Sequence, residues 1–177
     1  TRETCGKMQG VLPLRYYYQE NSGIAAAKNL GIFLSRAPIL FFFDDDDVAD
    51  KELLREHLKT HSEYLGESHA VLGYTTWSPT LKVTPVMHFV TDIGQLLFSY
   101  SHLKDGQILD FTYFWGGRSS CKRSFLVKHG IHDQQFRLTQ DIELGYRLSR
   151  FGFKVIFNRK AVSYMIRPVT YDEFCRR

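Results

Sequence analysis

The sequence predicts an α/β fold with a largely parallel sheet, from the order of its apolar patterns and the position of its carboxylates. Over residues 14–77 the patterns alternate strand, helix, strand, helix, strand, as in folds built from β-α-β units. A run of four aspartates, Asp44 to Asp47, directly follows a continuous apolar run. Ligands of such sheets bind outside the carboxyl ends of the strands, so the acidic run is expected at the ligand site.

The composition indicates one globular domain over all 177 residues. With 44% hydrophobic and 24% charged residues, the chain is unlike a disordered one. Its net charge is +4, but the basic residues form no dense run, so nucleic-acid binding is not indicated. Three cysteines at long spacings argue against a disulfide framework or a cysteine zinc site and favour a reducing compartment. The longest apolar stretch, 32–43, is too short to span a bilayer.

The first three expected elements follow from hydrophobic period. Residues 14–18 alternate like a strand, and a turn follows. Residues 23–35 carry one apolar face at helical spacing, and Pro38 ends this helix. Residues 39–43 are consecutive apolar residues, which suits a short strand covered on both faces.

The later elements follow from periodicity and capping signals. Asp50 is expected to cap a helix that carries Leu53 and Leu58 on its apolar side, before a strand over 70–77. An apolar stripe predicts a long helix over 86–100. Further elements are expected as a strand over 109–114, a helix over 123–129, a helix over 141–151, a strand over 154–157 and a helix after the capping box Thr170-x-x-Glu173.

The acidic run has two interpretations. Four adjacent carboxylates repel one another, so they need a cation or bulk water. A solvated acidic loop is the usual role of such a run, but the position after a buried strand favours a hard divalent cation with a phosphate-bearing ligand. An EF-hand is excluded because Ala49 and Arg55 occupy the positions that need Gly and Glu.

Other residues are candidates with open alternatives. Asp141 and Glu143 begin a helix, where a carboxylate is equally suited to a structural cap. The turn Trp115-Gly116-Gly117 allows close approach to a ligand and offers a ring for a sugar, or it is a turn with a buried Trp. His57 and His61 could face one metal, but core or surface histidines are the favoured interpretation.

Four blocks of the sequence together resemble the family 2 glycosyltransferases of the GT-A fold, an α/β/α sandwich. The resemblance extends over nearly the whole chain. The blocks are Gln19 to Gly23 with Ala27 to Gly31, then Ile39 to Asp47, then Trp115 to Gly117, then Gln140 to Leu148.

The resemblance implies a role for each candidate residue. Asp44-x-Asp46 matches the D-x-D motif, so Asp44 and Asp45 are expected on the donor side and Asp46 is expected to bind Mg²⁺ or Mn²⁺. Asp141 matches the general base that deprotonates the acceptor hydroxyl. Further positions are implied to bind the donor nucleotide, namely Lys28 and Asn29, or the donor sugar and acceptor, namely Trp115, Gly116, Gly117 and Glu143.

The implied activity is inverting, metal-dependent transfer of a sugar, of hexosyltransferase type, from a nucleoside diphosphate sugar to a glycan or lipid-linked acceptor. Such enzymes often build surface polysaccharide or glycolipid, so a cytoplasmic location, also at the membrane surface, is expected. Two alternatives stay open: a non-catalytic module that binds nucleotide sugars or carbohydrate, and a nucleotidyltransferase, which would release pyrophosphate.

Three departures from the family pattern are visible. Gln140 stands where the family usually has Glu, and Met165 lies near the place of a metal-binding His. Met is a poor ligand for hard cations, so the metal is expected to rely on Asp46, phosphates and water. The chain also starts at Thr1, after two strands that hold the nucleotide base in the family. We therefore expect an incomplete domain that is marginal or inactive when isolated.

Overall fold

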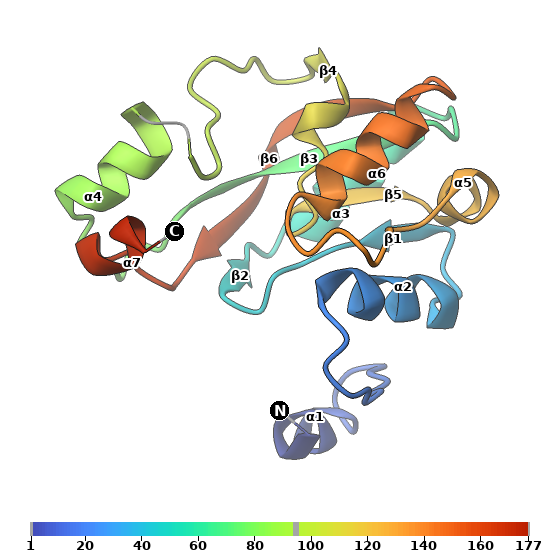
Figure 1. The fold of residues 1–177 in the computed structure, drawn as a ribbon, viewed down its shortest axis with the longest axis horizontal. Coiled ribbons are helices and arrows are strands. Elements are labelled where there is room, and N and C mark those ends of the chain that lie inside the picture. The colour runs from blue at the N-terminus through green and yellow to red at the C-terminus, as the bar shows by residue number, and fades with distance from the viewer. Residues whose placement is uncertain (1, 94–95, 177) are drawn as a thin grey trace.

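A computed structural model describes residues 2–93 and 96–176 of the chain. In this part of the chain, six strands form one sheet in the order β1-β5-β3-β6-β2, and β4 pairs separately with β6 (Figure 1). The strands are β1 Ile39–Phe41, β2 Asp47–Ala49, β3 His69–Trp77, β4 Ile108–Leu109, β5 Ser119–Lys122 and β6 Lys154–Met165. The helices are α1 Arg2–Met8, α2 Ile24–Leu34, α3 Leu53–Glu63, α4 Pro85–His88, α5 Arg123–His129, α6 Gln140–Ser149 and α7 Tyr171–Cys175, with a π-helical turn η1 Phe89–Ile93 and a 3-10 turn η2 Phe111–Tyr113.

The strand directions confirm the α/β class and refine the expected sheet. β3 and β6 are parallel, and the other four pairings are antiparallel. Because β5 is antiparallel to both of its neighbours, β1 and β3 point the same way. The three strands β1, β3 and β6 were expected from the sequence and share one direction, whereas the shorter strands between and beside them make the sheet mixed.

Two helices carry the candidate site, and their buried faces explain its position. On α6, Leu144 and Leu148 are one turn apart and fully buried in the core. Asp141 lies one turn before Leu144, so it is held at the inner side of the helix start. On α2, which runs beside β1 in Figure 1, Asn29 and Ile32 are buried and Lys28 lies next to them.

Three expectations about elements are wrong or only partly right. Residues 14–18 form no strand, because no other described strand lies beside them to pair with. Of the helix expected over 86–100, the structure describes α4 and η1 up to Ile93. Residues 94–95 lie outside the described residues, and 96–100 are not helical. Within 109–114 the strand ends at Leu109 and η2 follows, because the Asp110 side chain accepts a hydrogen bond from the Thr112 backbone.

The remaining elements match the sequence closely. The helix expected after Asp50 begins at Leu53, but Asp50 is not its N-cap. Glu52 holds that position, and the Asp50 carboxylate accepts a hydrogen bond from the Glu52 backbone N–H at 2.9 Å. The capping box of Thr170 and Glu173 is confirmed in α7. The short strands β2 and β5 were not predicted from the sequence. β6 is much longer than expected, because its pairing with β3 resumes after a bulge.

Candidate active site

The acidic run lies at the end of β1, as expected. Asp44 follows the strand and is half exposed, Asp45 is exposed, and Asp47 begins β2 with a completely buried side chain. The hydroxyl of Ser163 on β6 donates to Asp47 Oδ2 at 3.1 Å. The buried Asp47 side chain therefore anchors the turn, whereas the side chains of Asp44 to Asp46 stay partly or fully exposed to solvent.

Arg118 is a residue of this site to which the sequence assigned no role. It directly follows the two glycines of the Trp115 turn, and its guanidinium lies 3.5 Å from Asp44 Oδ2 and 3.7 Å from Asp47 Oδ2. Burial raises the pKa of both carboxyl groups and outweighs the opposing attraction of Arg118. Its place beside the glycine turn was the only signal that could have identified it.

The two glycines bring the acidic turn and Asp141 close together. The backbone N–H of Asp44 donates to the Gly117 carbonyl at 3.3 Å. A Cβ at Gly117 would collide with the Asp44 carboxylate, and a Cβ at Gly116 would collide with Lys28 and Asp141. Glycine is needed here because side chains from three other segments fill the space that a Cβ would take.

Asp141 is held by three hydrogen bonds at the start of α6. Lys28 Nζ donates to its two oxygens at 2.8 and 3.0 Å, and the Gly116 backbone N–H donates to Oδ2 at 3.2 Å. Both side chains of the ion pair keep some exposure, 16% for Lys28 and 20% for Asp141. The carboxylate is therefore oriented and charge-paired, and it is still accessible.

Backbone strain lies beside this carboxylate. Thr139, the residue before α6, has φ 59° in the left-handed region, which is costly for a β-branched residue. Gln140, which replaces the Glu usual in the family, is buried. Such strain gathers at functional sites, where the surrounding contacts hold it.

Two residues that were expected at the ligand are used elsewhere. Asn29 is buried, and its side-chain amide donates to the His132 carbonyl at 2.8 Å and accepts from the His132 backbone N–H at 3.0 Å. Glu143 is paired with Arg147, one turn along α6. Because residues 141 and 143 are about 200° apart around a helix, Glu143 does not share the face of Asp141.

Trp115 has its indole N–H bonded to the Thr112 carbonyl at 2.9 Å and its ring packed near Tyr100 and Tyr113. The ring is half-buried, so one part of it packs in the turn and the rest stays exposed to a ligand.

The donor set fits a hard divalent cation with few protein ligands. Within residues 2–93 and 96–176 no three His, Cys, Asp or Glu side chains gather to hold a metal. Asp46 has a partly exposed carboxylate without a side-chain partner among the described residues, and its backbone carbonyl is fixed by the Ile166 N–H at 2.9 Å. Met165, next to Ile166, is paired with Asp47 in the sheet. One carboxylate with phosphates and water is a usual set for Mg²⁺.

The fold is that of the GT-A class of glycosyltransferases. The chain belongs to the family described as Glycosyl transferase family 2, whose model matches residues 2–125. The expected family is thereby confirmed.

Similar curated proteins carry the same class of activity in their names. The chain is 25% identical to a validoxylamine A glucosyltransferase of Streptomyces hygroscopicus subsp. jinggangensis (strain 5008), over 91% of this chain and 44% of that protein. It is 24% identical to the uncharacterized glycosyltransferase YfnE of Bacillus subtilis (strain 168), over 82% of this chain and 48% of that protein. The chain thus spans about half the length of these relatives.

Solved structures support the fold. TarS 1-349 of S. aureus superposes with a TM-score of 0.68 at 12% identity, covering 94% of this chain and 47% of TarS 1-349. GalNAc-T7, solved with UDP, GalNAc and Mn²⁺, gives a TM-score of 0.65 at 12% identity, over 96% of this chain and 36% of that one. None of the helices described here is long and apolar enough to cross a membrane.

Proposed function

We propose that the protein is an inverting, metal-dependent glycosyltransferase that moves a hexosyl group from a nucleoside diphosphate sugar to the hydroxyl of a glycan or lipid-linked acceptor. One observation carries this proposal. The Gly116-Gly117 turn touches Asp141 through one residue and Asp44 through the other, so a proton acceptor and an acidic turn face one space. A transfer reaction needs these two functions on either side of the reacting carbon.

The two functions divide the chemistry of a displacement. In the proposed reaction the acceptor oxygen forms a bond to the anomeric carbon, and the bond from that carbon to the diphosphate oxygen breaks. The nucleoside diphosphate leaves with the electron pair, and the acceptor proton passes to Asp141. Attack from the face opposite the leaving group inverts the configuration of that carbon.

Lys28 links the two halves of the site. It pairs with Asp141, and it also acts on Asp44, where it opposes the burial that raises the pKa of that carboxyl. A donor diphosphate would offer Lys28 a second anion of higher charge. We assign Lys28 to the donor and to the charge balance of Asp141, while the contacts of Asn29 assign it to holding the fold.

Asp46 is the residue that would hold Mg²⁺ or Mn²⁺, with Asp44 and Asp45 beside it on the donor side. A bound cation would supply Lewis-acid neutralisation of the charge on the diphosphate. The Arg118 guanidinium lies near the carboxylates of both Asp44 and Asp47 and so offsets the repulsion between the neighbouring negative charges. The Mn²⁺ named for the GalNAc-T7 structure supports the choice of cation.

The chain is proposed to be part of a larger catalytic domain. Among the described residues β1 pairs with β5 alone, so one edge of β1 is open. A cavity of about 300 Å³ lies between α2 and this strand, lined by residues such as Ile32, Ile39 and Phe41. Further strands of the parent protein would fill this edge and complete the nucleotide site, in accord with relatives about twice as long. A cytoplasmic site of action is part of the same proposal.

The test is an assay of the full-length parent with a panel of nucleotide sugars, acceptor sugars and Mn²⁺ or Mg²⁺, with and without chelator. Metal-dependent release of nucleoside diphosphate with one donor is the expected result. Metal-dependent donor binding without release would favour a binding module, and release of pyrophosphate would show a nucleotidyltransferase. Either of these results would contradict the proposal.

A further inference from the structure

The loop before α6 brings a buried histidine, His132, to the Asp141 carboxylate. The backbone of His132 is held on both sides by the Asn29 side chain of α2, through hydrogen bonds of 2.8 and 3.0 Å. Paired bonds of this kind fix both the position and the rotation of a peptide segment. Asn29 therefore acts on this loop and not on a ligand.

A second clamp holds the preceding residue from the other helix. Arg147 of α6 donates to the Ile131 carbonyl at 2.7 Å, and Glu143 fixes the Arg147 guanidinium through an Nη2 hydrogen bond of 2.9 Å. The two residues that were expected to touch ligand, Asn29 and Glu143, thus both serve the loop that carries His132. Such double support is more than a surface loop needs.

The imidazole that these hydrogen bonds position is buried, and its nitrogens make no hydrogen bond among the described residues. The His132 side chain is 1% exposed, and neither ring nitrogen has a hydrogen-bond partner among the described residues. Its ring edge meets Phe42 at a centroid distance of 6.0 Å. A buried donor without a partner is costly, so its retention calls for an explanation.

The proposed catalytic carboxylate lies beside this imidazole. His132 Nδ1 lies 3.7 Å from Asp141 Oδ1, which is too long for a hydrogen bond and short enough for one to form after a small rotation. Besides burial, four groups act on the imidazole charge: the side chains of Asp141 and Arg147 and the backbone of Gln140 from α6, and Lys28 from α2. Burial is the largest influence and lowers the pKa of His132, against the attraction of Asp141, so the ring is neutral and carries one N–H.

We propose that His132 is a positioning residue for Asp141, whose Nδ1–H takes over the orientation of the carboxylate when Lys28 turns toward the donor diphosphate. This inference rests on the proposed function. An ionised carboxylate has about four acceptor positions, of which Lys28 and Gly116 fill three. Without Lys28 the Gly116 N–H would be its sole described donor, and the carboxylate could rotate out of line with the acceptor hydroxyl.

The first test does not need turnover. Nitrogen-15 NMR of histidine-labelled full-length protein, with His132→Asn to assign the signal, reports which ring nitrogen carries the proton. We expect Nδ1 to be protonated, and its signal to move in Lys28→Met, which frees Asp141, but not in Lys28→Met combined with Asp141→Asn. A His132 signal that Lys28→Met leaves unchanged would overturn the proposal, whether or not the protein transfers sugar.

The second test compares two substitutions of similar size in the full-length enzyme. His132→Asn keeps an N–H near the position of Nδ1, whereas His132→Leu has none, and both lose the same ring contact with Phe42. We expect kcat to fall about ten- to hundredfold in His132→Leu with an unchanged KM for the donor, and to be largely retained in His132→Asn. Equal losses in both variants would show a packing role only and overturn the proposal.

The two tests separate the inference from the function on which it rests. If wild-type protein released no nucleoside diphosphate with any donor, the proposed function would fail, and the NMR comparison would still decide whether His132 contacts Asp141. If wild-type protein is active and the His132 signal does not change in Lys28→Met, only the role of His132 is refuted.

Discussion

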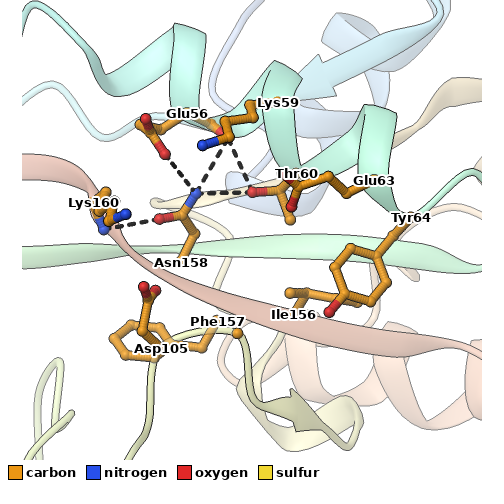
Figure 2. A pocket seen from close by; sticks show the side chains of 11 residues that line it. Glu56, Lys59, Thr60, Glu63, Tyr64, Asp105, Ile156, Phe157, Asn158 and Lys160 are labelled. Carbon is orange, nitrogen blue, oxygen red and sulfur yellow. Dashed lines mark hydrogen bonds between the residues drawn. The ribbon is translucent and has the colours of Figure 1, made fainter.

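Two polar regions of this molecule use similar side chains in different ways. Around Asp141 the charges of Lys28 and the carboxylate are partly exposed, and the nearby His132 has unpartnered nitrogens. Beside α3, the buried Asn158 of β6 has hydrogen-bond partners for both its amide nitrogen and its amide oxygen (Figure 2). The nitrogen donates to Thr60 Oγ1 at 2.8 Å and to Glu56 at 3.2 Å, and the oxygen accepts from the Lys160 N–H at 2.8 Å.

The difference separates a site for chemistry from a joint of the fold. The cavity beside Asn158 is small, about 150 Å³, and its acidic and basic residues nearly balance. On the same helix, His57 and His61 both bond the hydroxyl of Ser120, at 2.7 and 2.9 Å, so this hydroxyl accounts for their pairing without a metal. Nε2 of His57 also lacks a partner, so an unpartnered nitrogen alone does not distinguish the two regions. The Asp141 region differs because its unpartnered nitrogens lie beside an accessible, charge-paired carboxylate, which indicates function.

The largest expected effect is at the glycine turn. Gly116→Ala places a methyl group against Lys28 and Asp141, so we expect nucleoside diphosphate release to fall at least about 100-fold. Gly6→Ala is the matched control, because a Cβ at that position on α1 meets no atom and its activity should be unchanged. Steady-state kinetics of both full-length variants measure this effect. Full activity of Gly116→Ala would contradict the claim that the glycine turn must lie directly against Lys28 and Asp141.

A second prediction concerns acid sensitivity of the α3 region. Burial lowers the pKa of His57 to about 3 and of His61 to about 4, whereas an unfolded histidine has a pKa of about 6.5. Between these values the unfolded chain binds protons that the folded chain does not. Stability should therefore be lost as the pH falls below about 6.5, by about 1.4 kcal/mol per pH unit for each histidine.

Urea unfolding from pH 7 to 4.5 measures this slope in wild type and in a His57→Gln/His61→Gln variant. Asp44 and Asp47 have raised pKa values and act in the opposite sense, but they are present in both proteins and cancel in the difference. A variant with the same pH slope as wild type would show that these histidines are not buried neutral.

Asn158→Leu should affect stability and leave chemistry intact. The substitution removes donors to Glu56 and Thr60 and the acceptor for the Lys160 N–H, which should cost about 1–3 kcal/mol in unfolding free energy. Glu63→Gln on the cavity rim is the control, with stability near wild type. Unfolding midpoints and kcat are measured together, and a lower kcat with unchanged stability would move function to this region.

The smallest effect is expected at Met165. This residue is paired with Asp47 beside the acidic turn, and the family resemblance implies a metal-binding His near this position. Met165→His should tighten Mn²⁺ binding in the presence of nucleoside diphosphate by about tenfold, because imidazole is a far better ligand than thioether for this cation. Met165→Leu is the control, and calorimetric titration gives both constants. Unchanged affinity in Met165→His would place the cation away from this end of β6.

Elements with strong local signals could be predicted from sequence. The apolar face of α2, the buried run of β1 and the capping box of α7 each contain their own determinants within a few residues. β5 could not be found this way, because Ser119 to Lys122 show no apolar alternation and pair through neighbours distant in sequence. The stretch 14–18 has a strand pattern but no described partner.

The same limit applies to the site. The acidic turn, the glycine turn and Asp141 were recognised as separate motifs, and the structure brings them into one place. The structural roles of Asn29 and Glu143 could not be inferred from the sequence. Both depend on the loop that carries Ile131 and His132 lying against α2 and α6, and no local pattern predicts that contact. His132 gave no signal at all, because its closeness to Asp141 arises from a chain reversal before α6.

The central claim is that Asp141 accepts the acceptor proton while donor binding depends on other residues. Its most direct test is Asp141→Asn in the full-length enzyme, with donor affinity and sugar transfer measured on the same preparation. We predict that nucleotide-sugar binding with Mn²⁺ is kept and that transfer falls by about 100-fold or more. Retained turnover in Asp141→Asn would contradict the account.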